Sequence, residues 1–138
     1  MINVAKNVLH FSDLYCDGAI NIDMSMEYDV MFSNSVFSYF PGLRYAEEVL
    51  GRCLKIARHG IGLIDIHDPG KERDFIATRK SAIANYETLY KNLPKLFYKK
   101  SFFWDFAGKH NLDIVFMRED LNGYWNREFV FDVFLYEK

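Results

Sequence analysis

The sequence is poor in cysteine and proline, and each shortage excludes a class of protein. Its 2 cysteines, Cys16 and Cys53, lie in apolar patterns, and neither has the Cys/His spacing of a zinc site. A disulfide-rich scaffold is therefore excluded, and we expect two buried, reduced thiols in a cytoplasmic protein. With 3 prolines and 8 glycines, the chain is neither fibrous nor of low complexity.

Long apolar runs and blocks of one charge are also missing. No apolar run approaches the roughly 20 residues that span a bilayer, and the amino-terminal MINVAKNVLH lacks the apolar centre of a signal peptide. Acidic and basic residues are mixed, with a formal net charge of −2. We therefore expect neither a membrane nor a nucleic acid as partner. The 138 residues, 50% of them hydrophobic, predict a single globular domain, complete or partial, over 1–138.

Two apolar segments of the sequence end in polar residues. Tyr28–Phe32 reads as a buried strand, but it runs into Ser33-Asn34-Ser35 before an aromatic cluster begins at Val36. Ile61–Ile66 reads as a second strand, and it ends in a polar cluster followed by a Pro-Gly turn. Both are apolar almost throughout rather than alternating, which is typical of parallel strands covered on both faces.

Helical periodicity separates these strands and follows the second one. Apolar residues at helical spacing predict a helix over Arg44–His59, with Gly60 as its left-handed cap. Lys71–Leu93 is predicted to be helical up to Pro94, and Phe102–His110 has an apolar helical face. Strands separated by helices favour an α/β fold.

The two ends of the chain complete the predicted topology. Residues 112–120 and 128–138 are strands joined by a segment containing Asn122-Gly123, which predicts an antiparallel hairpin. Near the start, Ile2–Val8 is expected to be helical and Leu14–Cys16 to form a short strand. The fold class is therefore α/β, with a mostly parallel sheet and a carboxy-terminal antiparallel hairpin.

This order of motifs resembles the carboxy-terminal two-thirds of a class I S-adenosylmethionine-dependent methyltransferase. The similar segments are MINVAKN, LYCDGAINI, YDVMFSNSVFSYF, EEVLGRCLKIARHGIGLIDI and LFYKKSFFWDFAGKHNLDIVFM, in the order of the family. The resemblance implies a Rossmann-like sheet of seven strands in the full family fold, with the last two forming the hairpin. It also implies S-adenosylmethionine as cofactor.

The sequence departs from the family in one respect. The family's glycine-rich loop follows its first strand, and an acidic residue ends its second strand. Neither motif is present here, so the chain is expected to begin inside the second helix of the fold. A mis-assigned gene start, a truncated pseudo-enzyme and a shortened version of an enzyme all fit this expectation.

The resemblance assigns cofactor-binding roles to two groups of residues. Asp17, Gly18 and Ala19 match the turn where an acid accepts a hydrogen bond from the adenine amino group; alternatively, Asp17-Gly18 is only a tight turn. Ser33 and Asn34 match the loop beneath the sulfonium; alternatively, they only end a strand or cap a helix.

Four residues near these strand ends are the candidates for substrate binding and catalysis. Ser35, Asp65 and Asp68 are expected to contact the substrate, and His67 is the candidate general base because its pKa lies near neutrality. The Asp-x-His-Asp pattern also suits a metal site, although without a second ligand cluster we assign no metal. A hydrogen-bonded or solvated loop is the third reading. Phe37, Tyr39 and Phe40 are expected to belong to the core more than to a ligand platform.

Two functions follow from these expectations. In the first, the chain is an S-adenosylmethionine-dependent methyltransferase, or a truncated form of one, that transfers a methyl group to oxygen or nitrogen of a small-molecule substrate. The second is a catalytically inactive fragment that acts as an oligomeric or interaction module. In the family's sheet order, the first and second strands lie between the strands that Leu14–Cys16 and Tyr28–Phe32 match. Because these two strands are absent, Tyr28–Phe32 is expected to have an open apolar edge. Such an edge favours association, and we expect a homo-oligomer formed through it.

Overall fold

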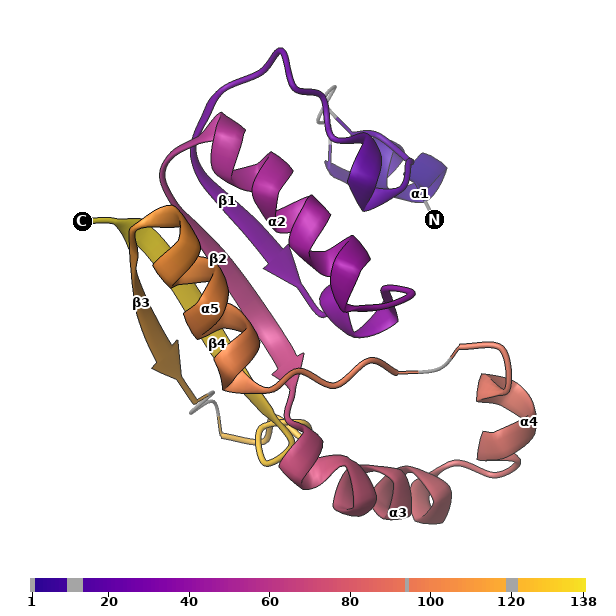
Figure 1. Ribbon diagram of the computed structural model, residues 1–138. Helices are drawn as coiled ribbons and strands as arrows, with labels where there is room; N and C mark the ends of the chain where they lie inside the picture. The colour runs from indigo at the N-terminus through magenta and orange to yellow at the C-terminus, as the bar shows by residue number, and fades with distance from the viewer. Residues whose placement is uncertain (1, 10–13, 94, 119–121) are drawn as a thin grey trace.

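The computed structural model describes residues 2–9, 14–93, 95–118 and 122–138, and a four-stranded sheet organises them (Figure 1). The strands are β1 (Tyr28–Asn34), β2 (Ala57–His67), β3 (Leu112–Met117) and β4 (Val130–Glu137), in the order β1-β2-β4-β3. β1 is parallel to β2, whereas β4 is antiparallel to both β2 and β3. Three strands therefore point the same way, and the predicted mixed sheet with its carboxy-terminal hairpin is confirmed.

Five helices and three short 3-10 turns connect these strands in the described part of the chain. The helices are α1 (Ile2–Leu9), α2 (Leu43–Ile56), α3 (Glu72–Ala82), α4 (Tyr86–Tyr90) and α5 (Lys100–His110). The 3-10 turns are η1 (Ala19–Asn21), η2 (Phe37–Tyr39) and η3 (Pro69–Lys71). Figure 1 shows α2 and α5 lying side by side on one face of the sheet, and α3 and α4 extending away from its lower end. None of the described helices has the length and apolar content needed to cross a bilayer.

The junction between α2 and β2 differs from the prediction. The helix ends at Ile56 and β2 begins at Ala57, so Gly60 lies inside the strand and caps nothing. Gly60 pairs with Tyr136 of β4, and a Cβ at this position would lie 2.7 Å from the Leu135 carbonyl oxygen. Close approach of β4 therefore explains the glycine, and the pairing with β4 overrides local helical preference.

Two other predicted elements are wrong. Leu14–Cys16 is not a strand, because in the described chain it has no neighbouring strand that shares its hydrogen bonds. The helix predicted over Lys71–Leu93 is split into α3 and α4, with Asn85 in the left-handed conformation at φ 58° between them. Asparagine tolerates this conformation better than most residues, which allows the chain to turn there.

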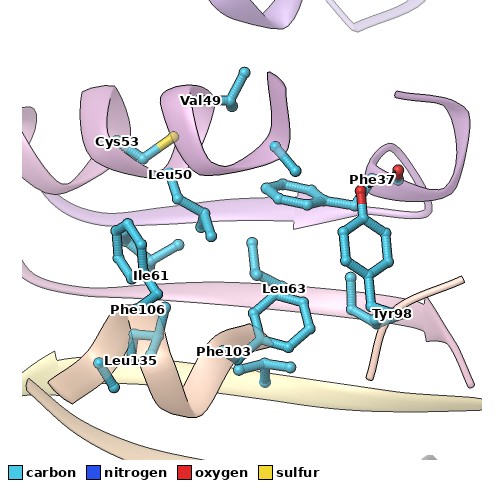
Figure 2. Packing of buried hydrophobic residues seen from close by; sticks show 14 of the residues in the cluster. Phe37, Val49, Leu50, Cys53, Ile61, Leu63, Tyr98, Phe103, Phe106 and Leu135 are labelled. Atoms are coloured by element: carbon cyan, nitrogen blue, oxygen red, sulfur yellow. Dashed lines mark hydrogen bonds between the residues drawn. The ribbon is translucent and has the colours of Figure 1, made fainter. Parts of the chain in front are cut away.

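The main core lies between the sheet and the pair α2 and α5. Figure 2 shows Leu50 of α2 and Phe103 and Phe106 of α5 pointing toward Ile61 and Leu63 of β2. A second, smaller cluster of Phe75, Phe129 and Val130 packs beneath α3. Burying a large apolar side chain contributes about 1.5–3 kcal/mol, so these contacts fix α2 and α5 against the sheet.

The aromatic segment after β1 belongs largely to this core. Phe37 and Phe40 are buried as predicted, and Tyr98 donates a hydrogen bond from its hydroxyl to the Phe37 carbonyl oxygen at 2.8 Å. Tyr39 is the exception, with 48% of its surface exposed.

The two cysteines lie in different environments. Cys53 is buried as predicted, and its burial raises the thiol pKa to about 11. Cys16 is exposed, which corrects the prediction of a second buried thiol. The expected strand around Cys16 is not formed, so its apolar neighbours have no sheet to pack into.

The sheet has an open edge and an exposed apolar face, so the prediction that Tyr28–Phe32 is buried and covered on both faces is wrong. β1 lies at one end of the strand order, so its outer backbone groups pair with no strand among the described residues, as expected. Strand register places Val30 and Phe32 beside Gly60 and Gly62, on the face opposite α2, and their exposed fractions are 44% and 68%. Such a surface is typical of an interaction site.

The close approach at Gly60 predicts a large effect of one methyl group. Gly60→Ala should lower the free energy of unfolding by about 1–3 kcal/mol, because a backbone carbonyl of β4 cannot move aside. Gly51→Ala is the matched control: nothing lies within 4 Å of the added Cβ, and in mid-helix it should stabilise α2 by up to about 1 kcal/mol. Urea denaturation followed by circular dichroism measures both. Equal stabilities of the two variants would contradict the packing described here.

Candidate functional site

The carboxyl ends of β1 and β2 are joined by a direct side-chain contact. Ser35 and Asp65 both adopt positive φ, at 57° and 69°. The Ser35 amide donates to the Ile64 carbonyl oxygen at 3.0 Å, and the Ser35 hydroxyl donates to Asp65 Oδ2 in a short hydrogen bond. A register shift between Leu63 and Ile66 in the β2–β4 ladder accommodates the unusual backbone at Asp65.

The Asp65 carboxylate is buried and fully engaged by protein donors. Its exposed fraction is 5%, and Asn126 Nδ2 donates to Oδ1 at 2.9 Å. The Asp65 backbone amide donates to Asp132 Oδ1 at 2.9 Å, which ties the same point to β4. Because both carboxylate oxygens have partners, this residue holds strand ends together in the present arrangement. Its contact with substrate stays a prediction.

Lys95 brings a charge to this strand end. Its Nζ lies 3.2 Å from Ser38 Oγ, 3.4 Å from His67 Nε2 and 4.0 Å from the centre of the Tyr39 ring. Ser38 Oγ in turn donates to the Ser35 carbonyl oxygen at 3.2 Å. Sequence reasoning missed both Lys95 and Ser38. No pattern in the sequence indicates that Lys95 lies beside His67.

His67 is buried beneath aromatic side chains. Its ring packs edge-on against Phe75 and Phe97, with centroids 4.6 and 5.5 Å away, and its exposed fraction is 1%. Burial and then the nearby Lys95 lower the His67 pKa to about 4, while Asp65 opposes this shift. The imidazole is therefore neutral near pH 7. An ammonium only donates hydrogen bonds, so Nε2 accepts from Lys95 and the ring proton lies on Nδ1.

Asp68, expected beside His67, lies in a different environment. Its carboxylate accepts a hydrogen bond from the Gly70 amide at 2.8 Å, and its own amide donates to the Phe129 carbonyl oxygen at 3.0 Å. It lines a charged cavity of about 180 Å³ together with Lys71, Lys100, Arg118, Arg127 and Glu128. The structure therefore separates Asp68 from the other candidate substrate residues.

The predicted cofactor residues converge only in part. Ala19 of η1 and Ser33 and Asn34 of β1 line one apolar cavity of about 230 Å³, with Phe37 and Phe40 in its wall. Asp17 and Gly18 do not line it. Asp17 Oδ1 accepts hydrogen bonds from the Gly18 amide at 2.7 Å and from Asn21 Nδ2 at 2.8 Å, and the Asn21 contact is the main cause of its lowered pKa.

A second cavity, of about 330 Å³, lies next to α3 and α4. It is enclosed mainly by aromatic side chains of α3, α4 and the segment before α5, namely Phe75, Tyr86, Tyr90 and Phe97. Lys95 lines this cavity, and His67 lies beneath Phe75 and Phe97. This cavity lies within the size range of small-ligand pockets, whereas the apolar cavity at the end of β1 is smaller.

The described residues form no metal-binding group. Asp65, His67 and Asp68 diverge to different partners, and nowhere in the described ranges do three His, Cys, Asp or Glu side chains come together as ligands.

The lowered pKa of His67 predicts a stability that depends on pH. The unfolded chain binds a proton at His67 below pH 6.5 while the folded chain stays neutral down to about pH 4. Stability should therefore be greatest above pH 6.5 and fall between pH 6.5 and 4, by at most about 3 kcal/mol.

Chemical denaturation at a series of pH values, on the wild-type chain and on His67→Gln, isolates this effect. The variant should lose the part of the slope that belongs to His67. His59→Gln, at an exposed position of β2, is the control and should keep the wild-type slope. Parallel curves for the wild type and His67→Gln would contradict the pKa shift.

Several solved structures of similar fold are methyltransferases by name. The sequence matches no protein-family model and no curated protein. One similar structure is magnesium protoporphyrin IX methyltransferase from Synechocystis PCC 6803 with bound SAH, at a TM-score of 0.62 and 10% identity. The match covers 99% of this chain and 57% of that enzyme, so the chain spans little more than half its length.

Two further structures agree with this match. A SAM-dependent methyltransferase from Methanosarcina mazei has a TM-score of 0.58 at 8% identity, with 97% of this chain and 74% of that chain covered. An O-methyltransferase family protein from Burkholderia thailandensis has a TM-score of 0.59 at 13% identity, with coverage of 99% and 40%. The chain therefore has the Rossmann-like fold of the S-adenosylmethionine-dependent methyltransferases.

Proposed function

We propose that this chain is part of an S-adenosylmethionine-dependent methyltransferase that modifies oxygen or nitrogen of a small molecule. The observation that carries the proposal is a cavity at the end of β1 together with an aromatic cavity lined by Lys95, whose ammonium contacts Ser38 and His67 beside the joined strand ends. In open α/β sheets, ligands bind beyond the carboxyl ends of the strands. One cavity is available for the cofactor and the other for the acceptor. We also propose that the protein is cytoplasmic, as expected from its low cysteine content.

The residues around the smaller cavity fit part of the cofactor. Ser33 and Asn34 offer hydroxyl and amide groups at the end of β1, where the resemblance places the sulfonium. Asp17 is exposed and uses Oδ1 for its turn, which leaves Oδ2 able to accept from an adenine amino group. We infer that the glycine-rich loop comes with a further parallel strand along the outer edge of β1, whose backbone groups are open to pairing.

The cofactor, when bound, supplies a methyl group attached to a positively charged sulfur. The residues of this chain would orient the acceptor for in-line attack and exclude water. His67 remains our candidate to accept the acceptor's proton, since it is neutral near pH 7. Its Nε2 faces Lys95, so the lysine would have to release it first. A pKa of about 4 also makes His67 a weak base, which suits an acidic acceptor group.

The open edge supports a second candidate function, an oligomeric interaction module. β1 has no proline and no lysine, the residues that commonly protect sheet edges. Val30 and Phe32 add apolar surface next to its free backbone groups. A second copy could pair antiparallel along β1, which places Asp29 of one copy away from Asp29 of the other and avoids like charges facing each other.

Binding of S-adenosylhomocysteine tests the enzyme proposal. Isothermal titration should give measurable binding to the wild-type chain, weaker than that of an enzyme that also carries the glycine-rich loop. Ala19→Trp should abolish it, because the larger side chain fills the cavity beside Ser33. Ala77→Trp, at an exposed position of α3, is the matched control and should bind as the wild type does. A folded wild-type chain that binds no S-adenosylhomocysteine would count against the enzyme and favour the module.

Size-exclusion chromatography with light scattering tests the module. The wild-type chain should elute as a homo-oligomer, and Val30→Lys should shift it to a monomer by placing a charge on the open edge strand. Val115→Lys changes a residue of similar exposure on β3, at the other edge of the sheet. It should leave the oligomer intact. A wild-type monomer at all concentrations would rule out self-association.

A further inference from the structure

We propose that the aromatic cavity between α3, α4 and Lys95 binds the acceptor, and that Lys95 selects an aromatic acceptor carrying an anionic oxygen, such as a carboxylate. This inference rests on the proposed methyltransferase function and names its substrate class.

The walls of the cavity suit a flat apolar molecule. Tyr86 and Tyr90 of α4 stack with ring centroids 4.8 Å apart, and Phe75 and Phe97 meet edge to face at 6.0 Å. All four rings line the cavity of about 330 Å³. Aromatic walls favour a ring that can stack or meet them edge-on. A cavity of this size accommodates a small aromatic molecule.

Lys95 supplies the polar end of this cavity with a positive charge. No described carboxylate lies within 4.0 Å of its Nζ. The ion pairs among the described residues involve other lysines and an arginine. Its neighbours Ser38, His67 and Tyr39 are uncharged in this arrangement. A half-buried ammonium without a counter-charge favours an anion as its ligand.

The geometry also leaves Lys95 one donor for that anion. An ammonium has three N–H donors. Ser38 Oγ and His67 Nε2 accept from two of them, and the ammonium also lies over the Tyr39 ring, so an anion would compete only with this ring for the third. The cavity contains two glutamates, but Glu87 is paired with Lys80 at 2.6 Å and Glu72 is exposed on the first turn of α3. Lys95 is therefore the lining residue best placed to bind an anionic oxygen.

The contacts beneath Lys95 hold the ammonium in place. His67 is fixed by a hydrogen bond from the Tyr98 amide to its carbonyl oxygen at 2.8 Å, and Ser38 is fixed through the Ser35 carbonyl oxygen. Within this inference His67 is a positioning residue for Lys95 and not the general base, because its Nε2 accepts from the ammonium. Because an ammonium favours the deprotonated form of a bound acid, the acceptor would arrive without the proton that a strong base must otherwise remove.

Benzoate and benzamide are the probes that test this inference. They have nearly the same shape, and only benzoate is charged. Isothermal titration of the wild-type chain should show benzoate binding roughly tenfold tighter than benzamide, as a charge-assisted hydrogen bond predicts. This comparison needs no variant. Equal binding of the two probes, or no binding of benzoate, would overturn the inference.

Three variants assign the preference to Lys95. Lys95→Met keeps the length of the side chain and should abolish the preference for benzoate, whereas Lys95→Arg should retain most of it. Lys91→Met changes an exposed lysine just after α4 and should behave as the wild type. Circular dichroism checks the fold of each variant, and Lys95→Gln replaces Lys95→Met if the latter unfolds. A Lys95→Met chain that still prefers benzoate would overturn the role of the lysine.

The titration with S-adenosylhomocysteine separates this inference from the proposed function. Binding of S-adenosylhomocysteine without discrimination between the probes would overturn only the acceptor class. If the chain prefers benzoate but does not bind S-adenosylhomocysteine, the anion-binding site at Lys95 is supported. The proposal that this site belongs to a methyltransferase is then overturned.

Discussion

The hydrogen bond between Ser35 and Asp65 is the constraint on which the site depends. Two residues without the conformational freedom of glycine adopt positive φ at the ends of β1 and β2, which costs free energy that the surrounding contacts must offset. Asn126 and Asp132 supply those contacts from the β4 side. Removing one partner from such a buried hydrogen-bond network typically costs about 1–3 kcal/mol, and more when a charged group is left unpaired, so the strand ends are held in one arrangement.

This arrangement explains why the two cavities have different chemical characters. Ser33 and Asn34 end β1 beside an almost wholly apolar cavity near α2. On the other side, the chain of contacts from Ser35 through Ser38 reaches Lys95, which faces aromatic rings. A charge lies on one side of the joined strand ends and an apolar surface on the other. That asymmetry is consistent with the proposed binding of two different ligands.

The open edge of β1 connects the two candidate functions. The same unpaired backbone groups are able to receive a parallel strand that completes a cofactor site or a strand from a second copy. Both occupants satisfy the same hydrogen-bonding groups and cover the same apolar side chains, Val30 and Phe32. They exclude each other physically. The two proposed functions are therefore mutually exclusive uses of this edge.

Local pattern was sufficient to predict the four strands of the described sheet and their order in the chain, but it also predicted a strand at Leu14–Cys16 that is not formed. The strands that begin near Tyr28 and Ile61, and the hairpin that contains Asn122-Gly123, depend on residues close together in sequence. They can therefore be predicted from the sequence. Asp65 and His67 were identifiable as polar residues at a strand end, but their burial and partners were not. Lys95 had no signal at all, because its role arises from contacts with Ser38 and His67, which lie 57 and 28 residues away in the chain. The tertiary structure alone decided which polar groups were buried, paired or left charged, since those properties depend on the residues that folding brings together.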